Sequence, residues 1–375
     1  MVSIGPYHYD KDKLKLGEAL KLKLTQQFFR DREPQIEVLH DKIFKEIGEL
    51  RGCYDEEPTN KYDDEALAWM LFVDGCSVLR YIHCYADKKF DELKIKNHEI
   101  AFVRQDLFLL ENQLSFQVLK LLMSDNGMEK IEKFILENWR KQPTPPPPQQ
   151  KPQPPPPQQQ PEIAPCHLLE LFRTELVGKP SKQDENTGNK EEDWQSFRDV
   201  TVLRAAGIHL KRSKTNCLHD VSFTYHLIFG YLSLPPLVVD DSTKAKFLNL
   251  IACEMCPEFD NKFEVTSYIC FLDSLIDQAD DVKKLRKKHI LHNFLGSDEE
   301  VAKLFNEIAT DLVPSFDIYR HVKADIQKHY DDIGKAWMAE FVHNHFSSPW
   351  TFIAFIAAVA AFAFSVVPYI KKDQK

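Results

Sequence analysis

The chain has 375 residues, with 48 Lys and Arg against 57 Asp and Glu, a formal net charge of −9. At about 150 residues per domain, this length corresponds to two or three domains. Hydrophobic residues make up 43% and charged residues 28%, which is close to a globular average and excludes wholesale disorder and a multi-span membrane protein. The acidic balance argues against a dedicated nucleic-acid binder. The 8 cysteines are too few for a disulfide scaffold.

The first part of the chain is predicted to be helical. It begins without an apolar run behind basic residues, so we expect no cleavable signal peptide in the sequence as it stands. An amphipathic helix is predicted by an apolar stripe at helical spacing, formed by Leu110, Leu114, Val118, Leu121 and Leu122. Asp106 and the trio Glu111, Asn112 and Gln113 interrupt this stretch. We interpret these polar residues as caps or members of a buried hydrogen-bond network, because the sequence identifies no base or nucleophile beside them.

Residues 142–165 mark a sharp change of composition, because 12 of these 24 residues are proline. Proline fixes φ and removes a backbone donor, so the segment cannot form helix or a central strand. We expect a Pro/Gln-rich, semi-rigid polyproline II insert. One interpretation is a docking ligand for an aromatic groove of the SH3, WW or EVH1 kind. The interpretation that we favour is a variable surface insertion.

The second half combines helices with short strands. Helices are expected at 246–256 and 267–276, and Ser297 with Glu300 forms the capping-box pattern that begins another helix. Glycine and proline break the strand-like runs into short pieces at 208–210, 221–223, 232–234 and 237–239. The predicted fold class is mainly α: a helical body with a small β element in its second half and one C-terminal transmembrane helix.

The transmembrane helix is predicted at 347–370. Sixteen of the 18 residues from 350 to 367 are apolar, and about 31 Å of helix, at roughly 1.5 Å per residue, would cross a bilayer core. A buried core helix is the alternative, although core helices rarely lack charge for so long. The residues expected to insert into or anchor at the bilayer are Trp350, Phe352, Ile353, Phe355, Ile356, Val359, Phe362, Phe364, Val366, Val367, Tyr369, Lys371 and Lys372.

Two signals conflict over topology. The lysines that follow the span, taken alone, place the C-terminus in the cytoplasm. That orientation requires export of the long preceding part of the chain without a visible signal, and long domains follow the charge rule poorly. We expect a single-pass protein of the plasma membrane or an endomembrane with the bulk of the chain in the cytosol. The exported orientation is the alternative.

Motifs that carry chemistry are absent from the sequence: no Walker loop, GxGxxG, GxSxG or HExxH occurs. Cys253 and Cys256 form a lone CxxC late in an apolar helical run, which is typical of structural cysteines rather than of a redox pair or zinc site. Two Glu-x-x-His pairs would each share a helix face without being tied into one metal site, namely Glu37 with His40 and Glu340 with His343. We predict no catalytic residue, cofactor or metal.

The densest basic run covers residues 283–288 (KKLRKK). One interpretation is contact with anionic lipid headgroups or with an acidic partner. The interpretation that we favour is a solvated helix face, whose charges are answered by Asp277, Asp280 and Asp281 one turn earlier.

Several segments, read in order, resemble a plant family, domain of unknown function 247. They are residues 3–8 (SIGPYH), 74–76 (DGC), 106–114 (DLFLLENQL), 167–173 (HLLELFR), 203–208 (LRAAGI), 234–241 (LPPLVVDD), 249–252 (NLIA), 265–268 (VTSY), 295–298 (LGSD) and 346–350 (FSSPW). The resemblance implies a largely helical plant protein with one C-terminal transmembrane helix. It implies no enzymatic activity, and recognition rather than catalysis.

We therefore predict five regions: an N-terminal helical part at 1–141, the proline-rich insert at 142–165, a helical part with short strands at 166–346, the span at 347–370 and a basic tail at 371–375. The predicted function is membrane-tethered, non-enzymatic recognition or scaffolding through protein–protein contacts. The alternatives are an enzyme with an unrecognised site in the helical body and a soluble nucleic-acid binder. The expected partners are the lipid bilayer and unknown proteins, with no nucleic acid and no identified small-molecule substrate.

Overall fold

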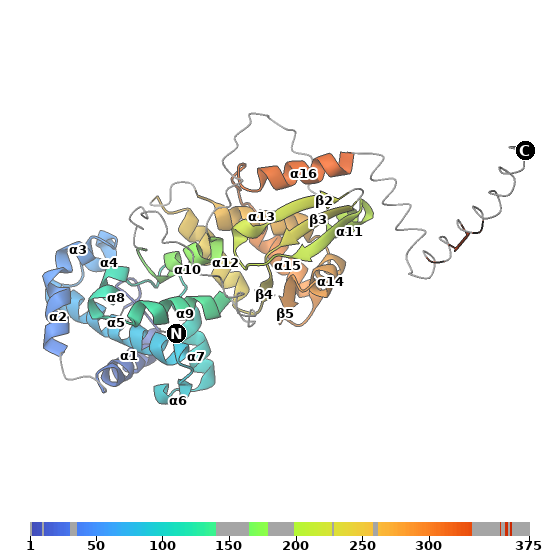
Figure 1. Cartoon of the computed structure of the whole chain (residues 1–375). Helices are drawn as coiled ribbons and strands as arrows, with labels where there is room; N and C mark the ends of the chain where they lie inside the picture. Colours follow the sequence, from blue (N-terminus) through green and yellow to red (C-terminus); the bar gives the residue numbers. More distant parts are fainter. Residues whose placement is uncertain are drawn as a thin grey trace, which may run out of the picture.

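The computed structural model describes residues 2–9, 11–30, 36–139, 165–178, 199–226, 229–257 and 262–331, and single residues at 353, 357, 358 and 361. In Figure 1 the first half of the described chain is helical, and the second half adds two small sheets. The mainly helical prediction with a small β element in the second half is confirmed. The region boundaries stay predictions, and residues 142–164 of the proline-rich insert lie outside the described residues.

The N-terminal half is organised by one long buried helix, α5 (Asp64–Ala86). Its sequence is apolar on most sides, so it needs neighbours all round, and α1, α2, α8 and α9 pack against it. Asp63 caps its start by accepting a hydrogen bond from the Ala66 N–H at 2.8 Å. The other elements of this half are η1 (Asp12–Leu14), α1 (Lys15–Phe28), α2 (Ile36–Lys45), α3 (Ile47–Arg51), α4 (Glu56–Thr59), α6 (Phe90–Leu93), α7 (Asn97–Asp106), α8 (Phe116–Leu122) and α9 (Gly127–Trp139).

The C-terminal half begins with α10 (Leu168–Val177), which contacts α9 of the first half and α12 and α13 of the second. Its buried apolar residues therefore join the two halves into one hydrophobic core. The other elements are α11 (Val200–Ala205), β1 (Ile208–Arg212), η2 (Leu218–Asp220), β2 (Ser222–His226), β3 (Phe229–Leu234), β4 (Leu237–Val239), α12 (Thr243–Glu254), α13 (Glu264–Leu275), α14 (Ala279–Lys287), β5 (Leu291–Asn293), α15 (Asp298–Ala309) and α16 (Arg320–Asp331).

The larger sheet has the strand order β1-β3-β2. β3 is its centre: it pairs in parallel with β1, Ile208 facing Gly230, and antiparallel with β2, Phe223 facing Leu232. Side chains alternate along β3, so that one face is buried. A Cβ on Gly230 would lie 2.6 Å from the Phe223 ring, so the close packing of β2 on β3 requires glycine there. The smaller sheet is a parallel pair, β4 and β5.

Four predicted strands and the helices of the second half are confirmed near their predicted positions as β1 to β4, α12, α13 and α15. Ser297 accepts a hydrogen bond from the Glu300 N–H at 3.2 Å, while the Glu300 carboxylate accepts from Gly296 at 3.0 Å. The helix predicted from the stripe at 110–122 was wrong in its first half, because α8 begins only at Phe116. Asn112 and Gln113 hold the preceding residues in a turn instead. β5 was not predicted, since its sequence, LHN, has a single apolar residue and no strand-like run.

The predicted C-terminal transmembrane helix is not supported, and this part of the fold class is corrected. Among the described residues, no helix combines the length and the apolar character that crossing a membrane requires. A span needs about 20 consecutive apolar helical residues. Of the predicted span at 347–370, the structure describes only residues 353, 357, 358 and 361.

Candidate functional site

The first residues of the chain are held against the helical core by side chains from distant positions. The Val2 N–H donates to Asp106 at 2.7 Å, the Ile4 N–H donates to Asn112 Oδ1 at 2.7 Å, and the Gly5 N–H donates to Asp74 at 2.8 Å. Each bond satisfies a buried backbone donor that would otherwise be costly. This N-terminal segment is therefore part of the packed fold.

A buried ion pair lies beneath this segment. Lys21 of α1 donates to Asp74 of α5 at 2.6 Å, and each side chain is only 1% exposed. Glu18 lies 2.8 Å from the same ammonium and accepts from the Ser3 hydroxyl at 2.6 Å. Burial raises the pKa of Asp74 to about 6, with Lys21 opposing the rise. Burial acts to lower the pKa of Lys21, but the Asp74 and Glu18 carboxylates outweigh it and raise that pKa.

Gly5 should tolerate no side chain, since its φ is +73° and a Cβ would lie 2.7 Å from the Gln113 carbonyl oxygen. We expect Gly5→Ala to lower the free energy of unfolding by about 1–3 kcal/mol. Gly48 is the matched control, because a Cβ there meets nothing within 4 Å. Gly48→Ala should be neutral or stabilising by up to about 1 kcal/mol. Urea titrations of both variants would measure the difference, and equal effects would contradict the close-contact account.

The polar residues around Asp106 and Gln113 form a satisfied buried network. Asn112 donates to the carbonyls of Val2 and Asp106 at 3.0 and 2.9 Å. Gln113 donates to the carbonyls of Leu107 and Leu109 at 2.9 and 2.8 Å and accepts from the Leu169 N–H at 3.1 Å. The interpretation as a buried hydrogen-bond network is confirmed for Asp106, Asn112 and Gln113. Glu111 lies outside the network, exposed beside His8 at 3.3 Å.

A second buried cluster ties the core of the C-terminal half together. Arg173 of α10 donates to Glu254 of α12 at 2.9 Å and also pairs with Glu264. Glu254, 1% exposed, accepts from the N–H groups of Val265 and Thr266 at 2.8 and 2.9 Å. These are first-turn donors of α13, so Glu254 caps that helix from outside. Burial raises the pKa of Glu254, with Arg173 opposing the rise.

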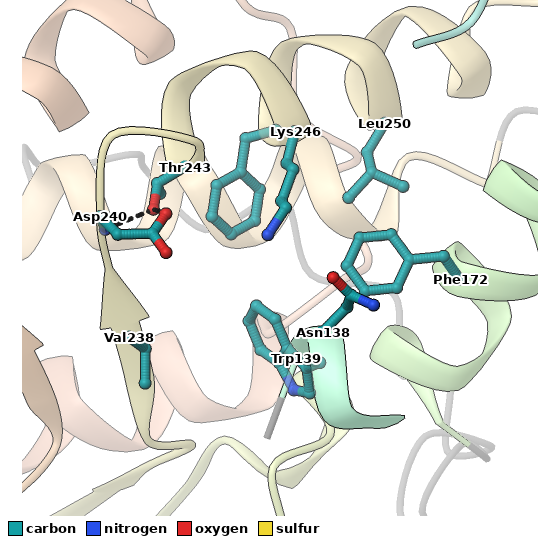
Figure 2. A pocket seen from close by; sticks show the side chains of 9 residues that line it. Asn138, Trp139, Phe172, Val238, Asp240, Thr243, Lys246 and Leu250 are labelled. Atoms are coloured by element: carbon teal, nitrogen blue, oxygen red, sulfur yellow. Dashed lines mark hydrogen bonds between the residues drawn. The ribbon is translucent and has the colours of Figure 1, made fainter. Parts of the chain in front are cut away.

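A small pocket lies where the two halves meet. Figure 2 shows Asn138 and Trp139 at the end of α9 facing Phe172, with Asp240, Lys246 and Leu250 on the other sides. The Trp139 indole donates to the Asn216 carbonyl at 3.0 Å, and Asp240 accepts from the Ser242 hydroxyl at 2.6 Å. The space that water can occupy is about 20 Å³, room for about one water molecule. A pocket of this volume is too small for an organic substrate.

An aromatic surface, defined as Ile36, His40, Phe44 and Trp69, lies on α2 and α5. Ile36, His40 and Phe44 are four residues apart and share one face of α2. The His40 ring stacks on Trp69 with ring centres 4.0 Å apart, and on Phe44 at 6.3 Å. The Trp69 indole donates to Glu65 at 2.9 Å, which fixes its orientation. Ile36, Phe44 and Trp69 are about 40% exposed.

The chain is similar to plant proteins over nearly its whole length. The profile of a family described as plant protein of unknown function, DUF247, matches residues 1–364. The chain belongs to the DUF247 family. The UPF0481 protein At3g47200 of Arabidopsis thaliana is 29% identical over 392 residues, covering 96% of this chain and 79% of that protein. A second UPF0481 protein of that plant, At3g02645, is 21% identical over 459 residues, covering 96% and 83%. No solved structure shows a significant match.

The predicted membership is thus confirmed, and the structure shows what several DUF247 segments do. The segments at 3–8, 74–76 and 106–114 meet in the N-terminal network, where Asp74 and Asn112 bond the backbone of residues 4 and 5. The segment at 167–173 joins this network through Leu169 and the second cluster through Arg173. These polar residues are engaged in holding the DUF247 fold.

Some of the remaining predicted positions lie within the described residues and others do not. Of the proposed anchor residues, only Ile353 is described, and it is 56% exposed; the others, and the pair Glu340 and His343, lie outside the described residues. Cys253 is fully buried and burial raises its pKa to about 12, as expected of a structural cysteine. In the other Glu-x-x-His pair, Glu37 with His40, the His40 ring stacks on Trp69. Among the described residues, no three His, Cys, Asp or Glu side chains group as a metal site would need.

Sequence reasoning missed the Lys21–Asp74 pair and the aromatic surface. One signal for the first was present, because Asp74 stands within a long apolar helix and a buried carboxylate must find a partner. The apolar stripe of α2 could also have been found in the sequence. Its exposure could not be predicted, since exposure depends on which neighbouring elements cover the stripe.

Proposed function

We propose that this chain is a non-enzymatic recognition or scaffold protein that acts through protein–protein contacts. The observation that carries the proposal is the aromatic surface on α2 and α5. Contiguous exposed apolar groups on a folded protein mark interaction sites. Tryptophan is enriched among the residues that dominate binding energy. Trp69 is already oriented by Glu65 and by the His40 stack, so little conformational freedom is lost when a partner covers it.

The use of the polar residues supports recognition over catalysis. Asp74, Asp106 and Glu254 accept hydrogen bonds from backbone donors, so their carboxylates are committed to structure. An enzyme would need a concave site with a few convergent polar groups. The pocket between the halves has convergent polar groups but room for about one water molecule. At the buried carboxylates and at this pocket, these observations favour recognition over catalysis.

Removing both exposed rings should weaken partner binding strongly without unfolding the protein. We expect the double variant Phe44→Ala and Trp69→Ala to bind a partner at least about thirtyfold more weakly, because hot-spot residues contribute about 2 kcal/mol or more. The measurement compares proteins crosslinked to wild type and variant in plant extract, followed by titration of the recovered partner.

The matched control is Leu248→Ala with Val313→Ala, two apolar side chains exposed elsewhere, 41% and 71%. This control should keep the partner. Urea titration of each variant would show that it is folded. Retention of every partner by the folded Phe44 and Trp69 variant would refute the proposal.

A further inference from the structure

A basic groove lies between α14 and β5, in the half of the chain opposite to the aromatic surface. It is lined by Lys283, Arg286 and Lys287 of α14, by the consecutive residues 291–294, and by Asp298, which pairs with Arg286. Water can enter about 500 Å³ of it, within the range of recognition sites, about 300–1,000 Å³. The groove therefore differs in size from the small pocket at the junction of the two halves.

The basic residues of α14 fall into two groups, those with an ion-pair partner and those without a direct ion pair among the described residues. Lys284 is answered by Asp280 at 2.9 Å, and Arg286 by Asp298 at 2.7 Å. Lys283 and Lys287 are exposed and form no ion pair within the described part of the chain. The interpretation of this run as a solvated helix face is thus confirmed, with direct ion pairs from Lys284 to Asp280 and Asp281, while the charges of Lys283 and Lys287 act on Asp280 without a direct ion pair.

One further cation lies near the groove. Burial lowers the pKa of His292 in the groove wall, and the positive charge of Arg212 lowers it further, so Arg212 adds to the positive potential there. On a chain of net charge −9, this local excess of cations favours a local acidic ligand. A nucleic acid would need a broader basic face to follow its phosphates.

The opposite wall fits an extended chain. Among the described strands β5 pairs with β4 alone, so its other edge is not occupied by a strand. Extended peptides bind beside such edges through backbone hydrogen bonds and side-chain contacts. Phe294, directly after β5, is 67% exposed and offers an apolar contact at the end of the groove.

We propose that the basic groove binds an extended acidic segment of a partner protein, with carboxylates on Lys283 and Lys287 and an apolar side chain on Phe294. This second contact site is separate from the aromatic surface and does not depend on it. Binding should weaken with added salt, because the lysines are exposed.

A fluorescent short peptide in which glutamate alternates with valine would test the proposal by anisotropy on the full chain. We expect Lys283→Glu with Lys287→Glu to weaken binding at least about tenfold. Lys120→Glu with Lys133→Glu, an equal charge change at exposed positions of α8 and α9, should leave it within about twofold. Phe294→Ser should weaken binding while leaving its salt dependence unchanged.

Equal weakening by the two lysine pairs would overturn the proposal, because overall charge alone would then explain binding. So would failure of the peptide to bind wild type, or tighter binding of duplex DNA or phosphatidylserine vesicles through Lys283 and Lys287. The Phe44 and Trp69 variant should bind the peptide like wild type, so failure at one surface is distinguishable from failure at the other.

Discussion

Replacing Lys21 by methionine should lower the free energy of unfolding by about 3–5 kcal/mol at neutral pH. Lys21 and Asp74 are both 1% exposed, so removal of the ammonium leaves a carboxylate buried without its cation. Breaking a buried pair in this way costs far more than the intact pair contributes. The Gly5 N–H would then donate to an Asp74 carboxylate that has lost its cation.

The loss should shrink as the pH falls. In wild type the folded-state pKa of Asp74 is raised to about 6, above its value of 3.8 in the unfolded chain. The folded state therefore binds more protons than the unfolded state between these values, and this group adds stability as the pH falls through that window. Without Lys21 the pKa of Asp74 should rise further. Protonation of Asp74 would then remove the buried negative charge at a higher pH in the variant than in wild type.

Urea titrations between pH 4 and 8 would measure both effects. Adding Asp74→Asn to Lys21→Met should recover part of the loss, because no charge is then left buried. Lys244→Met is the control: its pair with Glu307 is exposed, 46% and 43%, and its removal should change stability little. A pH-independent loss in Lys21→Met would contradict the assignment of the effect to Asp74.

Replacing Arg173 by methionine should cost about 3–4 kcal/mol for the same reason. Arg173 is 6% exposed, and Glu254, which it neutralises, is 1% exposed. The lost contacts join α10 to α12 and the start of α13, so the C-terminal half should be affected most. The control is Arg286→Met, whose pair with Asp298 is partly exposed and whose loss should cost less than about 1 kcal/mol.

Hydrogen exchange separates the two roles of Glu254. In Arg173→Met the amides of Val265 and Thr266 keep their acceptor, whereas in Glu254→Ala they lose it. We expect these amides to exchange faster than neighbouring α13 amides only in Glu254→Ala. Equal costs for Arg173→Met and Arg286→Met would refute the distinction between the buried and the exposed pair.

Local patterns predicted four short strands and the helices α12, α13 and α15 near their observed positions. Ser297 predicted the start of α15, and glycine and proline breaks isolated the strands that became β1 to β4. The stripe from Leu110 to Leu122 misled, because Asn112 and Gln113 bond backbone groups and hold a turn where the period suggested helix. The apolar run near the C-terminus predicted a span that the described residues do not support.

The sequence by itself determined the family, the mainly helical class and the sites of the strands β1 to β4, since these depend on ordered motifs and on spacing within a few residues. Only the tertiary structure decided which charges meet. Lys21 and Asp74 are 53 positions apart, and Arg173 and Glu254 are 81 apart. No local period encodes such pairs, because the packing of whole helices selects them. The same packing decides that Trp69 stays exposed and that Lys283 and Lys287 face a groove.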